Sequence, residues 1–315
     1  MLRKAIACIP ASTTNLGPGF DVLGLALKLY STVSLEEIDS DVRVVVHGVD
    51  RDKISASVDN IAFESADYIF QKAGYQPKGI KLTISNGIPA VRGLGGSGTA
   101  ILGGLLCANA ICGNPFSSDQ ILDFAIEREG HPDNVTASLL GGLTVSVVDK
   151  ENVKTIKLVP SENLRVVVAI PDYTLSTKKA RKVLPQNLDR QSAIYNIGRS
   201  SLLVAAIASG KLDLLNVAMQ DLLHQPYRAK LVPGFEDVCN SAVQAGALSV
   251  ALSGAGPSIA AYCTGMEDQV ANAMIGSFAE NGLNAVAKVL EIDSAGATVS
   301  DSAGKAISQH TENSY

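Results

Sequence analysis

The sequence predicts a soluble globular protein of the mixed α+β class that is large enough for two domains. The chain has 315 residues, of which 46% are hydrophobic and 18% charged, and such a composition can form a sizeable core. Segments with the alternating pattern of strands are interspersed with segments of helical period along the whole length. No internal repeat and no low-complexity linker interrupts them.

The first half of the chain alternates between predicted strands and helices. The β-branched alternation of residues 32–38 and 42–47 is typical of the two strands of a hairpin. Asn60 is expected to cap a helix that runs towards Gly74, because apolar side chains recur on one face after it. The other elements expected here are strands at 3–9, 79–85 and 143–148 and helices at about 97–111, 118–128 and 133–140.

The second half begins again with strands, and we place a domain boundary at Val159 and Pro160. We therefore expect an N-terminal domain over residues 1–159 and a C-terminal domain over residues 160–293. The polar segment 294–315 has no apolar period and is expected to be disordered. The elements expected here are strands at 153–159, 164–170, 248–252, 258–262 and 284–290 and helices at about 189–208, 211–224, 234–245 and 268–280.

Charge and residue usage exclude several classes of function. A net charge of -5 argues against a broad nucleic-acid surface, which needs clustered Lys and Arg. Residues 93–118 and 238–266 carry no charge, but Gly, Pro, Asn and Ser interrupt them too often for a membrane span. The apolar run at the start of the chain is too short for a signal peptide and meets Pro10. Five dispersed cysteines and four dispersed histidines predict reduced thiols, a cytoplasmic location and no zinc site.

The strongest candidate for chemistry is the glycine-rich segment Pro89 to Thr99, PAVRGLGGSGT, which follows a predicted strand and opens a predicted helix. Its glycines would let successive backbone N–H groups converge on an anion at the positive end of that helix. The segment is not a Walker A loop, because no Gly-Lys-Ser/Thr follows, and no regular βαβ unit surrounds it. Taken alone, it is either a phosphate site or a turn that lets the helix pack closely.

A second polar segment, which we expect to be a loop, runs from Pro10 to Asp21 between two predicted strands. Its hydroxyl and amide groups are unusually dense, and Asn15 and Asp21 could hold a polar ligand. A capped turn explains the same residues, since Asn, Asp and Ser satisfy their own backbone in loops.

A third candidate is the run EREGHPDNV that begins at Glu127. Glu127 and His131 have the i, i+4 spacing of a helical metal pair, but Pro132 ends the helix there. Carboxylates at a helix end suit Mg²⁺ better than zinc. The alternative is a solvated helix end, with Asp133 as the cap of the next helix.

Two weaker signals lie in the second half. The segment LSGAGPS, residues 252–258, falls in the other charge-free stretch and is an ordinary turn unless the fold brings it beside the first glycine loop. Arg181 and Arg228 would give a bidentate anchor for a small acid if they converged on one carboxylate. Each arginine alone is most simply a solvated surface charge.

In combination, these motifs resemble those of the GHMP small-molecule kinases. Three family motifs occur in order: PASTTNLGPGFDVLG, the phosphate loop IPAVRGLGGSGTA, and ALSGAGPS. The phrase EGHPDNV, followed by GGLTV, is similar to the branch of the family that phosphorylates L-homoserine. The resemblance covers about residues 3–290. It implies an N-terminal domain of the ribosomal S5 domain 2-like type and a ferredoxin-like C-terminal domain, with the site between them.

The resemblance also implies a role for each matching residue. ATP would lie on the phosphate loop, which the second glycine loop would support from the other domain. Asn15 and Asp21 would hold the hydroxyl and amino ends of L-homoserine, and the two arginines would grip its carboxylate. The implied nucleotide-binding residues are Pro89, Arg92, Gly93, Leu94, Gly95, Gly96, Ser97, Gly98, Thr99, Ser253, Gly254 and Gly256. The implied substrate-binding residues are Asn15, Asp21, His131, Asn134, Thr177, Arg181 and Arg228.

Mg²⁺ is the second cofactor that the resemblance implies, with Ser97 and Glu127 as its expected ligands and Glu129 as the alternative to Glu127. The chain departs from the family at Gly96, where the loop usually carries the first of two serines. Because a serine of this pair commonly binds the metal, the departure affects the second protein ligand. Water could take its place, since Mg²⁺ normally retains several waters.

The reaction implied is transfer of the γ-phosphoryl group of Mg·ATP to the side-chain hydroxyl of L-homoserine, which gives O-phospho-L-homoserine for threonine synthesis. Phosphoryl transfer depends mainly on alignment and charge stabilisation, so no catalytic base is assigned, and Asp21 is expected to bind the ammonium group. The alternatives are a GHMP kinase for another small alcohol such as mevalonate, or a non-catalytic binding protein of the same fold. No nucleic-acid or membrane partner is expected, and a homodimer is left open.

Overall fold

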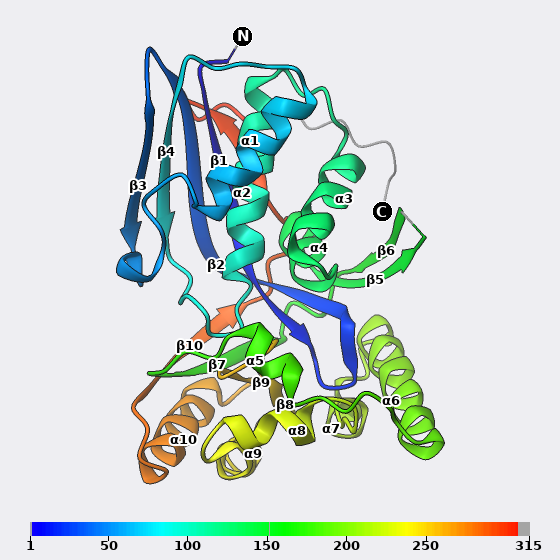
Figure 1. Ribbon diagram of the computed structural model, residues 1–315. Coiled ribbons are helices and arrows are strands. Elements are labelled where there is room, and N and C mark those ends of the chain that lie inside the picture. Colours follow the sequence, from blue (N-terminus) through cyan, green and yellow to red (C-terminus); the bar gives the residue numbers. More distant parts are fainter. Residues whose placement is uncertain (1, 151, 308–315) are drawn as a thin grey trace.

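The computed structural model describes residues 2–150 and 152–307, which form two lobes that are each built on one sheet (Figure 1). The strands of the first sheet are β1 (Lys4–Asn15), β2 (Gly19–Ile38), β3 (Val42–Gly48), β4 (Gly79–Asn86), β5 (Leu143–Asp149), β6 (Asn152–Leu158) and β11 (Thr298–Asp301). The helices beside that sheet are α1 (Ile61–Lys72), α2 (Gly96–Ile111), α3 (Ser118–Glu129) and α4 (Asp133–Leu140).

The second lobe follows the same plan on a smaller scale. Its strands are β7 (Arg165–Pro171), β8 (Ser249–Leu252), β9 (Ile259–Cys263) and β10 (Ala285–Glu291). Its helices are α5 (Thr177–Lys182), α6 (Arg190–Ser209), α7 (Leu215–Ala218), α8 (Gln225–Arg228), α9 (Phe235–Gln244) and α10 (Glu267–Glu280). Short 3₁₀ turns lie at Arg51–Lys53, Leu212–Leu214 and Ala229–Leu231.

The first sheet has the strand order β11-β1-β2-β4-β3, and β5 pairs with β2 and β6 with β5. We expected residues 32–38 and 42–47 to form a hairpin, and this prediction is wrong. Strand β4 lies between β2 and β3 and pairs with β3 in parallel, because the chain crosses over through α1 between β3 and β4. Helix α2 is buried along nearly its whole length beside α1 and the sheet, so the first charge-free stretch forms a core helix.

The second sheet has the order β10-β7-β9-β8 with antiparallel neighbours throughout. In chain order this is four-one-three-two, the arrangement of a ferredoxin-like sheet, and α9 and α10 pack against it. The predicted α+β class is therefore confirmed. The chain passes from the first sheet to the second between Leu158 and Arg165, and the boundary that we placed at residues 159 and 160 falls in this crossing.

The segment 211–224 does not form the single helix that we expected. A 3₁₀ turn and α7 end by Ala218, and the chain turns before α8 begins at Gln225. The carboxylate of Asp221 accepts the backbone N–H groups of residues 223–225. This local capture competes with the hydrogen bonds of a continuing helix.

The end of the chain also differs from the prediction, because residues 294–307 are ordered. Asp293 turns the chain by accepting the N–H groups of Ala295 and Gly296, and β11 then pairs antiparallel with β1. Val299 enters the core of the first lobe. A strand of four residues is too short to show an apolar period in sequence. Residues 308–315 of the expected disordered tail lie outside the described residues.

Among the helices of residues 2–150 and 152–307, none is both long enough and apolar enough to cross a membrane.

Candidate active site

A cavity of about 420 Å³ lies where the two lobes meet. It brings together residues that are far apart in the sequence and confirms that both glycine loops reach one place. The sequence-predicted residues that line it are Asn15, Asp21, Arg92, Gly93, Leu94, Gly95, Gly96, Ser97, Thr99, His131, Asn134, Thr177, Arg181, Arg228 and Gly254.

The phosphate loop turns directly into α2, whose N-cap is Gly95. The first N–H groups of a helix have no partner within it, and the helix dipole adds positive potential at the same end. The Thr99 hydroxyl donates to the carbonyl of Gly96 and stays inside the first turn. The start of α2 therefore offers backbone donors to an anion in the cavity.

The second glycine loop packs directly on the first. The hydroxyl of Ser253 donates to the carbonyl of Gly93 at 2.7 Å and also contacts the hydroxyl of Thr13. Gly93 has a φ of +74°, and a Cβ there would lie 2.1 Å from the Ser253 carbonyl oxygen. Ser253 and Gly256 do not line the cavity. We had placed them among the nucleotide-binding residues, and the structure gives them contact with the loop instead.

Several residues of the phosphate loop also anchor it to its surroundings. Arg92 is buried, and its guanidinium donates to Asp50 at 2.8 Å, to the carbonyl of Pro171 at 3.1 Å and to Asp172 at 3.3 Å. Its charge is thus committed to a contact between the lobes. The side chain of Leu94 belongs to the core. Pro89 is buried and Gly98 would meet Val135, and neither lines the cavity.

The two candidate metal carboxylates point in different directions. Glu127 is exposed and accepts a hydrogen bond from the hydroxyl of Tyr68 at 2.7 Å, outside the cavity. Glu129 lines the cavity and accepts from the hydroxyl of Ser97 at 2.8 Å. Residues two apart on a helix face opposite sides, so our preference for Glu127 is wrong and its alternative Glu129 lies in the site.

The oxygen atoms of Glu129 and Ser97, beside the start of α2, fit a hard cation. Burial raises the pKa of Glu129, an effect that the Ser97 hydroxyl and the nearby His131 partly oppose. A desolvated carboxylate beside a hydroxyl, next to a helix end that can accept an anion, is the oxygen environment that Mg²⁺ prefers. A Cβ on Gly96 would meet nothing within 4 Å, so the loop has room for the serine that the family usually carries there.

The opposite end of the cavity is built from charged side chains. Arg181 donates to both carboxylate oxygens of Asp21, at 2.7 and 2.9 Å. Its guanidinium lies 5.3 Å from the ring centre of Phe20, and that of Arg228 lies 5.0 Å from the same ring. The two arginines that we expected to grip one carboxylate are therefore held against one aromatic side chain.

Arg228 is fully buried, with 1% of its surface exposed. It donates to the carbonyls of Ala180 and Gly254 at 3.2 and 3.1 Å. Burial, together with the charge of Arg181, lowers its pKa to about 10, so it remains a cation at neutral pH. A buried cation whose hydrogen bonds go to neutral carbonyls retains a strong attraction for an anion.

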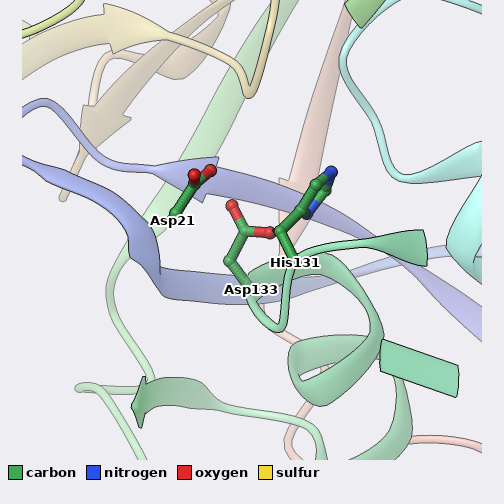
Figure 2. Close-up of side chains that lie close together, drawn as sticks. All are labelled: Asp21, His131 and Asp133. Carbon is green, nitrogen blue, oxygen red and sulfur yellow. The ribbon is translucent and has the colours of Figure 1, made fainter. Parts of the chain in front are cut away.

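Asp133, which we had expected to cap the next helix, is the first residue of α4, and its buried carboxylate faces this end of the cavity. It bonds Nδ1 of His131 at 2.6 Å. Figure 2 shows Asp133 between Asp21 and His131. Ligand atoms of the three residues lie within 4.8 Å of one another, but Asp21 is paired with Arg181 and His131 with Asp133. The cluster is therefore a network of hydrogen-bonded side-chain pairs.

Three other predicted residues lie at the edges of this network. Asn15 donates to the carbonyl of Gly254 at 2.9 Å and accepts the backbone N–H of Asp21, so its amide shapes the tip between β1 and β2. Asn134 accepts a hydrogen bond from Ser12. Thr177 begins α5 at the rim.

The segment from Pro10 to Asp21, which we expected to be a loop, is mostly strand, because β1 continues to Asn15.

Sequence reasoning missed the apolar end of the cavity. Its wall includes Ile54, Ile61, Ile84 and Ile88 together with Asn60 and Asn86. Both asparagine amides are engaged by the chain itself, Asn60 at the start of α1 and Asn86 with residues 31, 49 and 88. Isoleucines look like ordinary core residues in a sequence, so no sequence signal distinguishes this wall.

Comparison with known proteins agrees with this geometry. The model of the GHMP kinases N terminal domain matches residues 60–142, and that of the GHMP kinases C terminal domain matches residues 203–281. Both lobes thus carry the domains of a GHMP kinase. A homoserine kinase of Moorella thermoacetica is 43% identical over 291 residues, which cover 92% of this chain and 98% of the relative.

A crystal structure of homoserine kinase from Cytophaga hutchinsonii has a TM-score of 0.87 and 29% identity, and the match covers 95% of this chain and 98% of that one. A mevalonate kinase from L. major has a TM-score of 0.68 at 14% identity, with 93% and 95% covered, which shows a shared fold alone. The chain belongs to the homoserine kinase family of the GHMP kinases.

Proposed function

We propose that this protein transfers the γ-phosphoryl group of ATP to the side-chain hydroxyl of L-homoserine and forms O-phospho-L-homoserine and ADP, a step of threonine biosynthesis. The observation that carries the proposal is the pairing of a backbone anion site at α2 with a charged end that holds Asp21, Arg181 and Arg228 in one cavity. Relatives named homoserine kinase over nearly the whole chain support it.

The charged end favours a zwitterion as the acceptor. A free amino acid brings a carboxylate for Arg181 and Arg228 and an ammonium group for Asp21, so its binding exchanges one ion pair for two. Mevalonate brings only a carboxylate, and Asp21 would then keep no cation but Arg181. Because leaving a charge unpaired in a partly buried site is costly, the arrangement selects against acids that lack an amino group.

The chain's own groups align the reactants. The N–H groups at the start of α2 would hold the phosphates of ATP. The apolar wall around Ile61 and Ile84 would enclose its adenine ring. The hydroxyl oxygen of homoserine attacks the γ-phosphorus, the bond from that phosphorus to the bridging oxygen breaks, ADP leaves and the hydroxyl proton passes to water. Alignment and charge stabilisation provide most of the rate of such a transfer, and we assign no base.

We further propose that the Glu129 carboxylate and the Ser97 hydroxyl would hold Mg²⁺ at the α2 end of the cavity. The ion would neutralise charge on the phosphates while the phosphoryl group is transferred.

The reduced state of the five cysteines, all free, supports the proposed cytoplasmic location. The oligomeric state, for which a homodimer is left open, can be measured by sedimentation of the purified protein.

The test is an ADP-release assay with L-homoserine, 4-hydroxybutyrate, mevalonate and a hexose as acceptors. We expect turnover of homoserine, with 4-hydroxybutyrate poor because it lacks the ammonium group. Turnover of mevalonate without homoserine would contradict the proposed substrate. Absence of turnover with every acceptor would favour a non-catalytic binding protein.

A further inference from the structure

A buried histidine joins the tip of the β1–β2 hairpin to the arginine at the acceptor end. His224 precedes α8 and has 0% of its surface exposed. Its Nε2 lies 2.7 Å from the carbonyl oxygen of Gly17, and its Nδ1 lies 3.5 Å from Nη1 of Arg228. The ring therefore contacts both lobes at once, although His224 does not line the cavity.

The two contacts fix which nitrogen carries the proton. A carbonyl oxygen can only accept, so Nε2 of His224 donates to Gly17. Burial lowers the pKa of His224; the charge of Asp221 opposes that change and the charge of Arg228 adds to it. In the neutral ring Nδ1 then has a lone pair, and that lone pair faces the guanidinium of Arg228.

Asp221 does not compete for the Nε2 proton. Its nearest oxygen is 3.5 Å from Nε2 of His224, farther than the carbonyl of Gly17. The carboxylate is already occupied by the side chain of Asn196 at 2.6 Å and by the N–H groups of residues 223–225. Asp221 therefore fixes the backbone at His224.

The tip of the β1–β2 hairpin has little freedom, because it packs against the second lobe. Gly17 has a φ of +79°, and a Cβ there would lie 2.0 Å from the carbonyl oxygen of Met219. Three residues further on, the Phe20 ring lies 5.2 Å from the ring of His224 and within 5.0 Å of the Arg228 guanidinium. The next residue is Asp21, so the position of the tip sets the distance between Asp21 and the arginines.

We propose that His224 is a positioning residue of the acceptor site, which orients Arg228 through Nδ1 and holds the β1–β2 tip through Nε2. The inference rests on the proposed function, because it assigns Arg228 to the carboxylate of the acceptor. His224 touches neither substrate. Its effect is to keep the guanidinium aimed into the cavity at a fixed distance from Asp21, so its loss weakens acceptor binding and leaves nucleotide binding intact.

Two substitutions separate the two contacts. His224→Gln retains a donor near Nε2 for Gly17 but has no acceptor at the position of Nδ1. His224→Asn retains an acceptor near Arg228 but cannot reach Gly17. We expect His224→Gln to raise the KM for homoserine about tenfold, the scale of one hydrogen bond to a charged group, and His224→Asn to raise it severalfold, the scale of a hydrogen bond between neutral groups. The KM for ATP should stay within about twofold of wild type in both. In an Arg228→Gln background, His224→Gln should have no further effect on the KM for homoserine.

A matched core variant distinguishes positioning from stability. Met274→Ala removes a fully buried side chain from the far face of the second sheet and should lower Tm without changing the KM for homoserine. If the His224 variants lower Tm but leave that KM unchanged, as Met274→Ala should, the inference is overturned. If wild type fails to turn over homoserine, the proposed function falls and the inference with it, whereas normal wild-type turnover with unaltered KM in the variants overturns the inference alone.

Discussion

The two ends of the cavity hold charge with different parts of the chain. Beside α2, the groups that an anion would meet are backbone N–H groups of one continuous segment, residues 93–97. At the other end they are side chains of Asp21, Asp133, Arg181 and Arg228, which come from separate segments of both lobes. A backbone site depends on the path of the chain, while a side-chain site depends on which residue is present. Substitutions should therefore affect the two ends in different ways.

The largest effect is expected where the backbone path itself is changed. Gly93→Ala would place a Cβ 2.1 Å from the carbonyl oxygen of Ser253 at a positive φ, so the two glycine loops must separate. A displacement of about 1 Å can cost on the order of 100-fold in rate, and we expect at least that loss of kcat/KM for ATP. Gly96→Ala is the control, since a Cβ there meets nothing within 4 Å. Equal losses in both variants would show that the loop path is not the cause.

The next effect separates the two carboxylates at the end of α3. Glu129→Gln should lower kcat/KM by about 10- to 100-fold, in the range seen when groups that support a metal site are removed, and should raise the Mg²⁺ concentration needed for half-maximal rate. Glu127→Gln makes the same change on the opposite face of the helix and should be near wild type. A Mg²⁺ titration of both variants measures this, and the reverse result would return the metal to Glu127.

At the side-chain end, Arg181→Leu should raise the KM for homoserine about tenfold or more, because a charged hydrogen-bonded partner is lost. The KM for ATP should change little, since Arg181 belongs to the charged end. Lys178→Leu removes the same charge from an exposed position on the same helix and is expected to be near neutral. Steady-state kinetics with each substrate varied would decide, and an unchanged KM for homoserine would remove Arg181 from the site.

The smallest effect concerns the hydroxyl that joins the two glycine loops. Ser253→Ala removes the hydrogen bond to the Gly93 carbonyl and should cost about 1 kcal/mol of unfolding free energy, with a severalfold rise in the KM for ATP. Ser277→Ala is the matched control, because its buried hydroxyl has no hydrogen-bond partner among the described residues. Denaturant titration of both proteins tests the difference, and equal stability of the two variants would contradict it.

The backbone end of the site could be predicted from sequence because its information is local. The glycines of residues 93–98, the strand before them and the helix after them are contiguous, and the family resemblance brought residues 253–256 to the same place. The choice between Glu127 and Glu129 failed although their spacing was known. The spacing shows that the two side chains face opposite sides of α3, but not which side of α3 faces the cavity.

The side-chain end was predicted in its residues but not in its contacts. The resemblance supplied Asp21, Arg181 and Arg228, yet nothing in the sequence indicated that Phe20 lies against both arginines. Asp133 was expected to be a helix cap, since a buried carboxylate beside His131 cannot be told from a cap by spacing. The misplaced hairpin has a tertiary cause, because strand order is decided by contacts between distant segments. The helix predicted at 211–224 is interrupted by a local cause, the backbone N–H groups that the Asp221 carboxylate accepts.

Strand β11 has a consequence for the order in which the protein forms during synthesis. The ribosome releases β1 before the other described strands, but its neighbour on one side, β11 at residues 298–301, is translated after all of them. Until those residues emerge, the nascent first lobe carries an unpaired strand edge, which is a template for unwanted pairing with other chains. The whole second lobe must be translated before that edge is closed, so residues 298–301 protect a strand that was made long before them.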